Sequence, residues 1–225
     1  MTRTTTLNLI LAATLFTTTS LAAPPTVKPS LKFDGTSDYA LIVFESEPQN
    51  VVSDWRPEFF SFAPESRKWT YGPLKGWSVF KPIDNPPGDR FHAALVKPAG
   101  IYAINNISVQ TYWKACLNGG TAAFRLEAGK VNYIGLIDPQ PNFAEIRAHL
   151  PMEISGMGGL PHQILFDIPR LHLTPPSAVP QWTAALTDFL AAALPKVTAP
   201  IVAAEPIDVT FEPGRVVGKQ ICEKY

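Results

Sequence analysis

The sequence predicts a mostly-β protein, an antiparallel β-sandwich with one packed C-terminal helix and a C-terminal hairpin. Short apolar segments are separated by turn residues, and residues 122–127 alternate apolar and polar side chains as a half-buried strand does. Proline is frequent, at 23 of 225 residues, and long helices tolerate little proline. One segment, 180–194, repeats apolar side chains at helical spacing.

The N-terminus has the pattern of a cleavable signal peptide over residues 1–22. A basic start at Arg3 precedes the apolar run 7–16, and Ser20 and Ala22 occupy the two positions that a signal peptidase requires to be small. The alternative, a membrane anchor, needs about 20 apolar residues, roughly twice the length of this run. We therefore expect cleavage after Ala22 and a periplasmic or secreted protein without a membrane span.

The composition after the leader indicates a globular chain with a nearly neutral surface. The whole chain has 19 basic and 19 acidic residues, and removal of the leader takes away only Arg3. This balance gives no electrostatic reason to expect nucleic acid or an anionic membrane as a partner. Hydrophobic residues make up 46% of the chain, which excludes a disordered protein. We expect a flexible lead-in over 23–37 and a single domain over 38–225.

The predicted strands are short and are bounded by turns that contain proline or glycine. Turns are expected at 97–100, 118–120 and 128–129, the last because glycine accepts a positive φ. The sandwich is expected to span roughly 38–170, with a loop over 139–162. The expected strands cover 40–44, 58–63, 68–71, 77–80, 90–96, 101–109, 122–127, 130–138 and 164–168.

Two further elements are expected after the sandwich. Pro180 suits the first turn of a helix that Pro195 ends, so the helix is expected near 180–194. Its apolar stripe consists of Trp182, Leu186, Phe189 and Ala193. Residues 207–211 alternate apolar and polar side chains, and Pro213-Gly214 turns the chain into 215–222, which predicts the C-terminal hairpin.

The two cysteines, Cys116 and Cys222, are expected to form a disulfide. An exported chain meets an oxidising compartment, where two thiols tend to pair. The alternative is two separately buried free thiols, because two cysteines without a spacing motif do not define a bridge. A disulfide would tie the last residues of the chain to the domain.

Catalytic signatures are incomplete wherever the sequence approaches one. Residues 156–159 resemble part of a dinucleotide-binding loop, but Pro161 replaces its third glycine. Residues 214–219 resemble a phosphate-binding loop, but the spacing is one residue short and Gln220 stands where Ser or Thr is needed. The chain has neither a G-x-S-x-G nor an H-E-x-x-H motif. We therefore assign no catalytic residue, no cofactor, no cofactor-binding residue and no metal ligand.

The histidines allow one alternative to a non-catalytic protein. None of the four, His92, His149, His162 and His172, forms a pair at the i, i+4 spacing of helical metal ligands. Two of them, His162 and His172, flank the expected strand 164–168, and Asp167 lies between them in that strand. A metal-dependent enzyme or hydrolase would draw its first candidates from His92, His162, Asp167 and His172, whereas surface or turn histidines are the more common case.

Two other groups of side chains have both a structural and a functional interpretation. Glu45 and Glu47 share a strand face, and solvated charges at a strand end explain them better than a catalytic pair. Aromatic residues are dense between Trp55 and Phe80, where exposed rings would bind a sugar or an apolar segment and buried rings would fill the core. The core is the expectation, because most large apolar side chains lie inside. These aromatic residues are Trp55, Phe59, Phe60, Phe62, Trp69, Tyr71, Trp77 and Phe80.

Residues 94–137 carry a family resemblance. Leu95 to Tyr102, LVKPAGIY, gives an apolar strand followed by Pro-x-Gly-x-aromatic, and Phe124 to Gly135, FRLEAGKVNYIG, contains Ala-Gly-Lys-x-x-Tyr. This pattern resembles a bacterial domain of unknown function found in exported envelope proteins and lipoproteins with a β-sandwich. The resemblance implies that fold and an envelope location, and it implies no catalytic residues. This chain lacks the cysteine that would carry a lipid anchor.

The functional expectation has two classes. The first is an exported, non-catalytic module of unknown molecular function that binds an envelope or secreted partner, either a protein or a cell-wall component. The second is a hydrolase or metal-dependent enzyme whose site is assembled from distant residues. Convergence of the histidine candidates in a cleft would favour the enzyme, and scattered histidines would favour the binding module.

Overall fold

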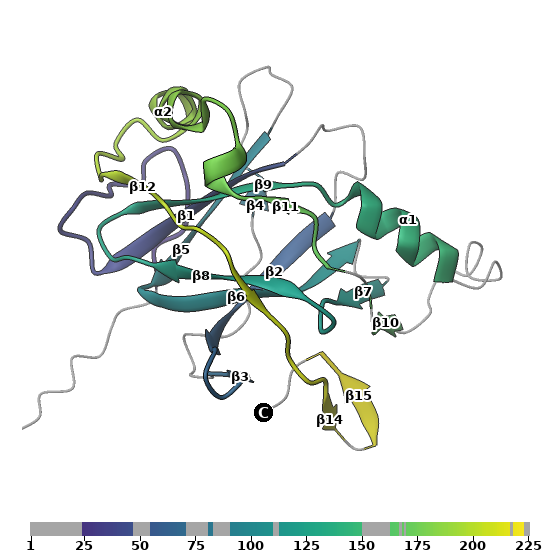
Figure 1. Cartoon of the computed structure of the whole chain (residues 1–225). Coiled ribbons are helices and arrows are strands. Elements are labelled where there is room, and N and C mark those ends of the chain that lie inside the picture. The colour runs from purple at the N-terminus through teal and green to yellow at the C-terminus, as the bar shows by residue number, and fades with distance from the viewer. Residues whose placement is uncertain are drawn as a thin grey trace, which may run out of the picture.

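Two β-sheets packed face to face form the body of the protein (Figure 1). The computed structural model describes residues 24–46, 55–70, 81–82, 91–109, 113–149, 163–166, 168, 170–216 and 218–222. This arrangement confirms the predicted mostly-β class with a packed helix and a C-terminal hairpin. The predicted signal peptide, 1–22, lies outside the described residues.

The described elements follow one another in this order. They are β1 (Tyr39–Ser46), β2 (Trp55–Ala63), β3 (Lys68–Trp69), β4 (Lys81–Pro82), β5 (Phe91–Pro98), β6 (Gly100–Val109), β7 (Trp113–Cys116), β8 (Thr121–Leu126), β9 (Val131–Ile137), α1 (Gln140–His149), β10 (Gln163–Leu165), β11 (Leu173–Thr174), the short 3₁₀ helix η2 (Pro176–Ala178), α2 (Trp182–Ala193), β12 (Ile201–Ala203), β13 (Ile207–Val209), β14 (Gly214–Val216) and β15 (Lys219–Ile221).

The first sheet, sheet I, is mixed and has β1 at its centre. Its order is β11-β9-β1-β5-β4, and β12 pairs with the same edge of β9 as β11. β1 runs antiparallel to β5 and parallel to β9. The continuous apolar run 40–44 suits this position, because a central strand covered on both faces needs apolar side chains on both.

The second sheet, sheet II, is built around the long strand β6. Its order is β10-β7-β6-β2-β3, and β8 follows β7 along the same edge of β6. Residues 117–120 bulge out between β7 and β8, so the expected turn at 118–120 does not reverse the chain. β13 pairs with the outer edge of β8 and extends the sheet there.

The space between the sheets holds the largest group of buried apolar side chains. Ile42 and Phe44 point into it from β1, and Tyr102, Ile104 and Phe124 point into it from sheet II. None of these five side chains is more than 1% exposed. Alternation along the strands explains this placement, since every second side chain shares a face.

Helix α2 covers the outer face of sheet I (Figure 1). Its buried side chains are Leu186, Phe189, Leu190 and Ala193. They pack on Leu41 and Val43 of β1 and on Val131 and Tyr133 of β9, which confirms the predicted packed helix. The helix begins at Trp182 after an N-cap at Gln181, so Pro180 precedes the helix instead of occupying its first turn.

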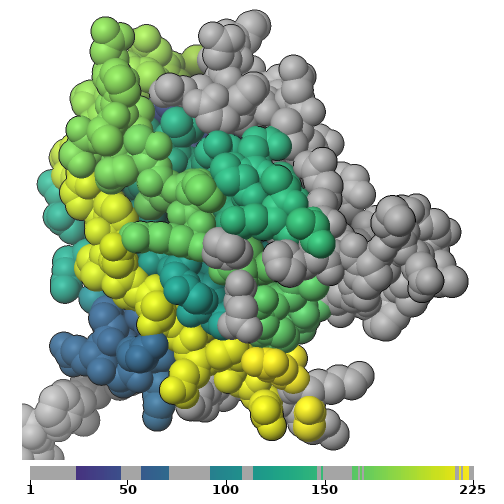
Figure 2. Space-filling model, turned by 45° about the vertical axis from the view of Figure 1, so that its right-hand side comes forward, coloured from purple at the N-terminus to yellow at the C-terminus, as the bar shows by residue number. Residues whose placement is uncertain are grey.

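The C-terminal residues 207–222, here called the strap, begin at the edge strand β13 and then cross the outer face of sheet II. The strap crosses the molecule as a continuous yellow band in Figure 2. Phe211 packs edge-on against Trp69, with ring centroids 4.8 Å apart, and the segment then forms the β14–β15 hairpin. The hairpin is therefore shorter than predicted, because residues 207–209 join β8 instead of pairing with 215–222.

Two of the predicted tight turns carry the chain from one sheet to the other. β5 belongs to sheet I and β6 to sheet II, and β8 and β9 are likewise in different sheets. At the second crossing Gly129 has φ +64°, and a Cβ there would lie 2.4 Å from the carbonyl oxygen of Gly35. Glycine is thus required for its backbone conformation and for the close approach of residue 35.

Two segments differ from their expected structure. The lead-in 24–37 lies against the domain, because Leu31 and Phe33 are buried beside α2 and Phe33 exchanges backbone hydrogen bonds with Lys196 and Thr198. Residues 140–149, expected to be part of a loop, form α1, which has Phe143 as a buried anchor. The sequence of α1 has no regular apolar stripe, which is why periodicity did not predict the helix.

The contact at Gly129 generates a stability prediction. We expect Gly129→Ala to lower the free energy of unfolding by about 3 kcal/mol or more, because the new Cβ meets a backbone oxygen that cannot move alone. The matched control is Gly218→Ala, which also has a positive φ but has no atom within 4 Å of the new Cβ. We expect this control to cost about 1–2 kcal/mol. Urea unfolding measures both, and equal losses would contradict the proposed role of the Gly35 contact.

Candidate functional site

Four polar side chains gather on the outer face of sheet II, where a β-bulge brings two of them together. Glu58 pairs with Asn106 and Phe59 pairs with Ile104, so Asn105 is an extra residue in β6. Ile104 and Ile107 both point into the core between the sheets. The two asparagines between them therefore face outward together.

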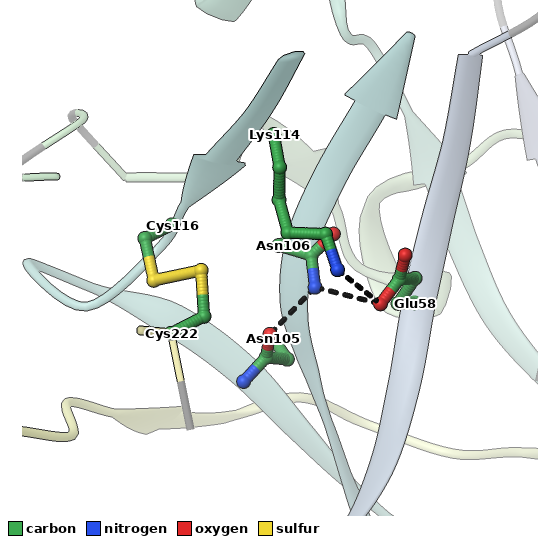
Figure 3. Close-up of a disulfide and its surroundings, with 6 residues drawn as sticks. All are labelled: Glu58, Asn105, Asn106, Lys114, Cys116 and Cys222. Carbon is green, nitrogen blue, oxygen red and sulfur yellow. Dashed lines mark hydrogen bonds and ion pairs between the residues drawn. A yellow bond between two sulfur atoms is a disulfide. The ribbon is translucent and has the colours of Figure 1, made fainter. Parts of the chain in front are cut away.

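The side chains of this group, here called the polar cluster, converge on one carboxylate oxygen. Lys114 Nζ lies 3.1 Å from Glu58 Oε2, and Asn106 Nδ2 donates to the same oxygen at 2.9 Å (Figure 3). Asn106 Nδ2 also lies 2.6 Å from Asn105 Oδ1. Three neighbouring strands, β2, β6 and β7, thus each contribute to a single hydrogen-bonded group.

Burial makes the polar cluster unusual. The two asparagines are fully buried, Glu58 is 4% exposed and the Lys114 side chain is 27% exposed. Asn106 Oδ1 and Asn105 Nδ2 are buried, and neither atom has a hydrogen-bond partner among the described residues. Buried polar groups are usually satisfied, so an orphaned amide oxygen beside a buried ion pair needs an explanation.

The disulfide adjoins the polar cluster and fixes the strap. Cys116, in β7, pairs across the strands with Asn106 and is bonded to Cys222 at the end of the strap. The Cα atoms of the two cysteines are 5.4 Å apart, and both residues are buried. This confirms the predicted disulfide and ties positions separated by 106 residues.

A second buried polar group lies under α2. Tyr133 donates its hydroxyl hydrogen to Glu45 Oε1 at 3.0 Å, and His92 Nε2 lies 3.6 Å from the same oxygen. The His92 ring stacks on Phe189 of α2 with centroids 4.4 Å apart, and the Tyr133 ring stacks on Trp182. This group joins β1, β5 and β9 to the helix.

The histidine candidates do not come together where the structure describes them. His92 is buried and faces α2, whereas His172 is exposed beside β11. His92 lies in β5, and His172 directly precedes β11. Three strand spacings of roughly 4.8 Å separate β5 from β11 in sheet I, a distance of about 14 Å. His162 and Asp167 lie outside the described residues, and His149 is the last residue of α1.

The expectation of solvated charges is wrong for Glu45. This residue is 1% exposed because α2 covers the face of sheet I that it shares with Val43. Glu47 and the glycine-rich segment 156–159 lie outside the described residues. In the segment 214–219, which resembles a phosphate-binding loop in sequence, residues 214–216 and 219 belong to the paired strands β14 and β15.

Four of the aromatic residues are buried as expected, Phe59, Phe60, Phe62 and Trp69, but most of them do not fill the core between the sheets. Phe59 lies in that core, whereas Phe60, Phe62 and Trp69 lie on the outer face of sheet II beneath the strap. The ring of Trp69 packs against both phenylalanines and against Phe211. Tyr71, Trp77 and Phe80 lie outside the described residues, and Trp55 begins β2.

Lys97 is a further buried charged residue, at the end of the sandwich where the chain crosses between sheets. It is 2% exposed, and its Nζ lies 5.9 Å from the centroid of the Tyr102 ring. Burial lowers the pKa of the Lys97 ammonium from 10.5 to about 8, because the charged form loses its hydration. Burial raises the pKa of the Tyr102 phenol from 10.0 to about 12 for the same reason.

Comparisons with known proteins leave the site to be interpreted from its own geometry. No family model, curated protein or solved structure matches the chain. Among the described residues, no group of three or more His, Cys, Asp or Glu side chains is placed to hold a metal ion. A search of the same residues for membrane-spanning helices finds none of sufficient length and apolarity.

The disulfide generates the second prediction. The double variant Cys116→Ser with Cys222→Ser should lose about 2–4 kcal/mol of unfolding free energy, because the closed loop restricts the unfolded chain. Urea unfolding without reductant measures this loss of free energy. The control is the wild type whose disulfide has been reduced after the chain was unfolded. A double variant as stable as the oxidised wild type would show that the strap needs no covalent tether.

Lys97 generates a prediction about pH. Between pH 8 and 10.5 the unfolded chain retains a proton that the folded chain has released, so stability rises with pH. From pH 8 to pH 10 we expect a gain of roughly 2 kcal/mol. Above pH 10 ionisation of Tyr102 opposes it, because the folded state keeps that proton longer. The variant Lys97→Met should be more stable at pH 7 and should lack the gain, whereas Lys68→Met, at an exposed position, should retain it.

Proposed function

We propose that the chain is an exported β-sandwich module that binds an envelope or secreted partner and does not catalyse a reaction. The observation that carries the proposal is the buried disulfide between β7 and the end of the strap. Such bonds persist in oxidising compartments and are rare in the cytosol. The proposed signal peptide over 1–22 and the resemblance of residues 94–137 to exported envelope proteins support the same location.

The packing of the described polar side chains supports binding over catalysis. His92 is 8% exposed and lies between Glu45 and the ring of Phe189, so its imidazole has little exposed surface for a substrate. A general base must reach the proton that it removes, and this burial disfavours such contact. A β-sandwich whose strap is held by a disulfide suits a module that must keep its structure outside the cell.

Export is tested first, with the full-length chain in a Gram-negative host. We expect the protein in the periplasmic fraction, beginning at Ala23 and without free thiols when denatured in the absence of reductant. The control lacks residues 2–22 and should stay in the cytoplasm with two free thiols. A wild-type protein that stays in the cytoplasm and retains Met1 would overturn the export proposal.

Partner binding is tested with the mature chain, residues 23–225, immobilised and incubated with envelope extract. We expect a partner that is retained by this chain, identified by mass spectrometry, and not retained by an unrelated disulfide-bonded β-sandwich of similar size. Metal analysis of the same preparation distinguishes the other class. One equivalent of zinc, lost in His162→Ala, would indicate a metal-dependent enzyme instead.

A further inference from the structure

The polar cluster contains a primary amine, a carboxamide and a carboxylate on three adjacent strands. We propose that Lys114 and Asn106 join in an isopeptide bond between β7 and β6, with release of ammonia, and that Glu58 carries the protons. The proposal concerns covalent maturation of the chain and stands independently of export and partner binding.

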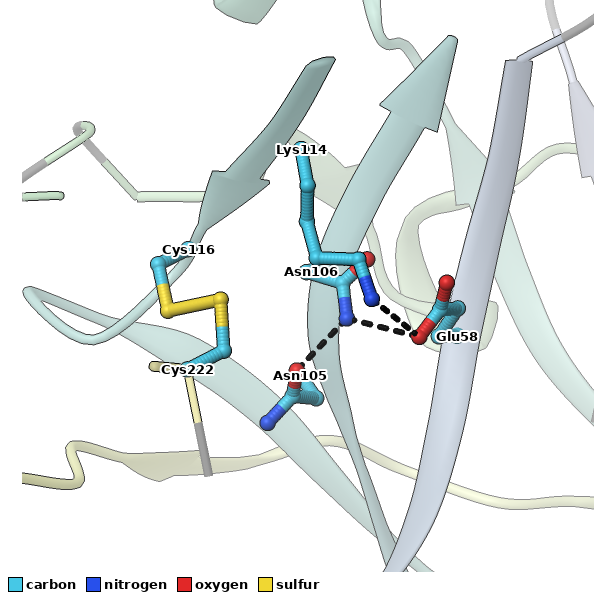
Figure 4. A network of polar contacts seen from close by, with 6 residues as sticks. All are labelled: Glu58, Asn105, Asn106, Lys114, Cys116 and Cys222. Carbon is cyan, nitrogen blue, oxygen red and sulfur yellow. Dashed lines mark hydrogen bonds and ion pairs between the residues drawn. A yellow bond between two sulfur atoms is a disulfide. The ribbon is translucent and has the colours of Figure 1, made fainter. Parts of the chain in front are cut away.

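The geometry places the reacting groups around one atom. Lys114 Nζ and Asn106 Nδ2 lie 3.1 Å and 2.9 Å from Glu58 Oε2, and Figure 4 shows both contacts meeting at that oxygen. Strand pairing holds this arrangement. In β6, Asn106 lies opposite Glu58 of β2, and Ser108 lies opposite Lys114 of β7. Groups held together on a rigid frame react as if highly concentrated.

The reaction balances without any other reactant. Lys114 Nζ attacks Asn106 Cγ, so a C–N bond forms there while the bond from Cγ to Nδ2 breaks. Two protons leave Nζ and reach Nδ2 by way of Glu58, and nitrogen departs as ammonium while the carboxylate is restored. No electron is gained or lost. The flexible stem of lysine allows Nζ to reach Cγ from its position beside Glu58.

The unsatisfied amide distinguishes Asn106 from a structural asparagine of the same fold. Asn132 is equally buried, yet its amide nitrogen donates to the carbonyl oxygens of Glu127 and Lys130 and its oxygen accepts from the Glu127 backbone. Within the part of the chain that the structure describes, Asn106 Oδ1 has no hydrogen-bond partner, and Asn106 Nδ2 is directed at the carboxylate that would protonate it. A buried acceptor left unsatisfied beside a charge pair calls for an explanation, and a role in a reaction is one such explanation.

Burial also protects the product. Glu58 and Asn106 are at most 4% exposed, so water has little access to the new amide. The bond would join β7, a strand of four residues that also carries the disulfide, to the neighbouring strand β6. Strand β7 would then be covalently held both to its neighbouring strand and to the strap.

Intact-mass spectrometry of the reduced, denatured mature chain tests the proposal. We expect a mass about 17 Da below that of the sequence, the mass of one ammonia. After digestion, fragmentation should find residues 106 and 114 joined through their side chains and no tryptic cleavage after Lys114. A deficit of about 18 Da would instead indicate water loss and a Lys114–Glu58 amide, which overturns the assignment to Asn106.

Matched variants separate the roles of the three residues. Lys114→Arg keeps the positive charge beside Glu58 but replaces the amine, and Glu58→Gln keeps the shape but removes the proton carrier. Both should show the full sequence mass while retaining the wild-type circular dichroism spectrum. Lys68→Arg, the same substitution at an exposed lysine outside the polar cluster, should still lose ammonia. A wild-type chain of full sequence mass, or a deficit that persists in Lys114→Arg, overturns the proposal.

Discussion

Much of both faces of sheet II is buried, and this burial governs the chemistry of the polar cluster. One face packs on sheet I and part of the other lies beneath the strap, and the side chains of Glu58, Asn105 and Asn106 have little access to water. A buried carboxylate without a partner is strongly unfavourable, and Glu58 is accordingly paired with an amine and an amide. The disulfide stabilises the cover that produces this environment.

The parts of the fold that the sequence predicts are those specified by local patterns. Residues 122–127 and the stripe of α2 reveal their buried faces through periodicity alone, and both are placed as expected. Strand pairing has no such local signal. The parallel contact between β1 and β9 and the crossing at Gly129 depend on residues far apart in the chain, so the expectation of an antiparallel sandwich includes neither.

The polar cluster could be anticipated only in part, for the same reason. Two consecutive asparagines inside the apolar segment 101–109 are a visible anomaly in the sequence. Their shared face depends on a bulge opposite Glu58, and their burial depends on chain segments that cover sheet II. Glu45 illustrates the same limit. The alternation along its strand predicts which face of the sheet it occupies, but the helix that buries this face comes much later in the chain.

The position of β1 at the centre of sheet I has a consequence for the order in which the chain acquires structure. A polypeptide emerges from the ribosome with its N-terminus first, so β1 emerges early while its parallel neighbour is still being made. The hydrogen bond from Ser46 to Ile137 spans 91 residues, which at about 5–20 residues per second takes on the order of 5–20 s to synthesise. During that interval an apolar strand waits without its final neighbours, exposed to aggregation or to capture by a chaperone.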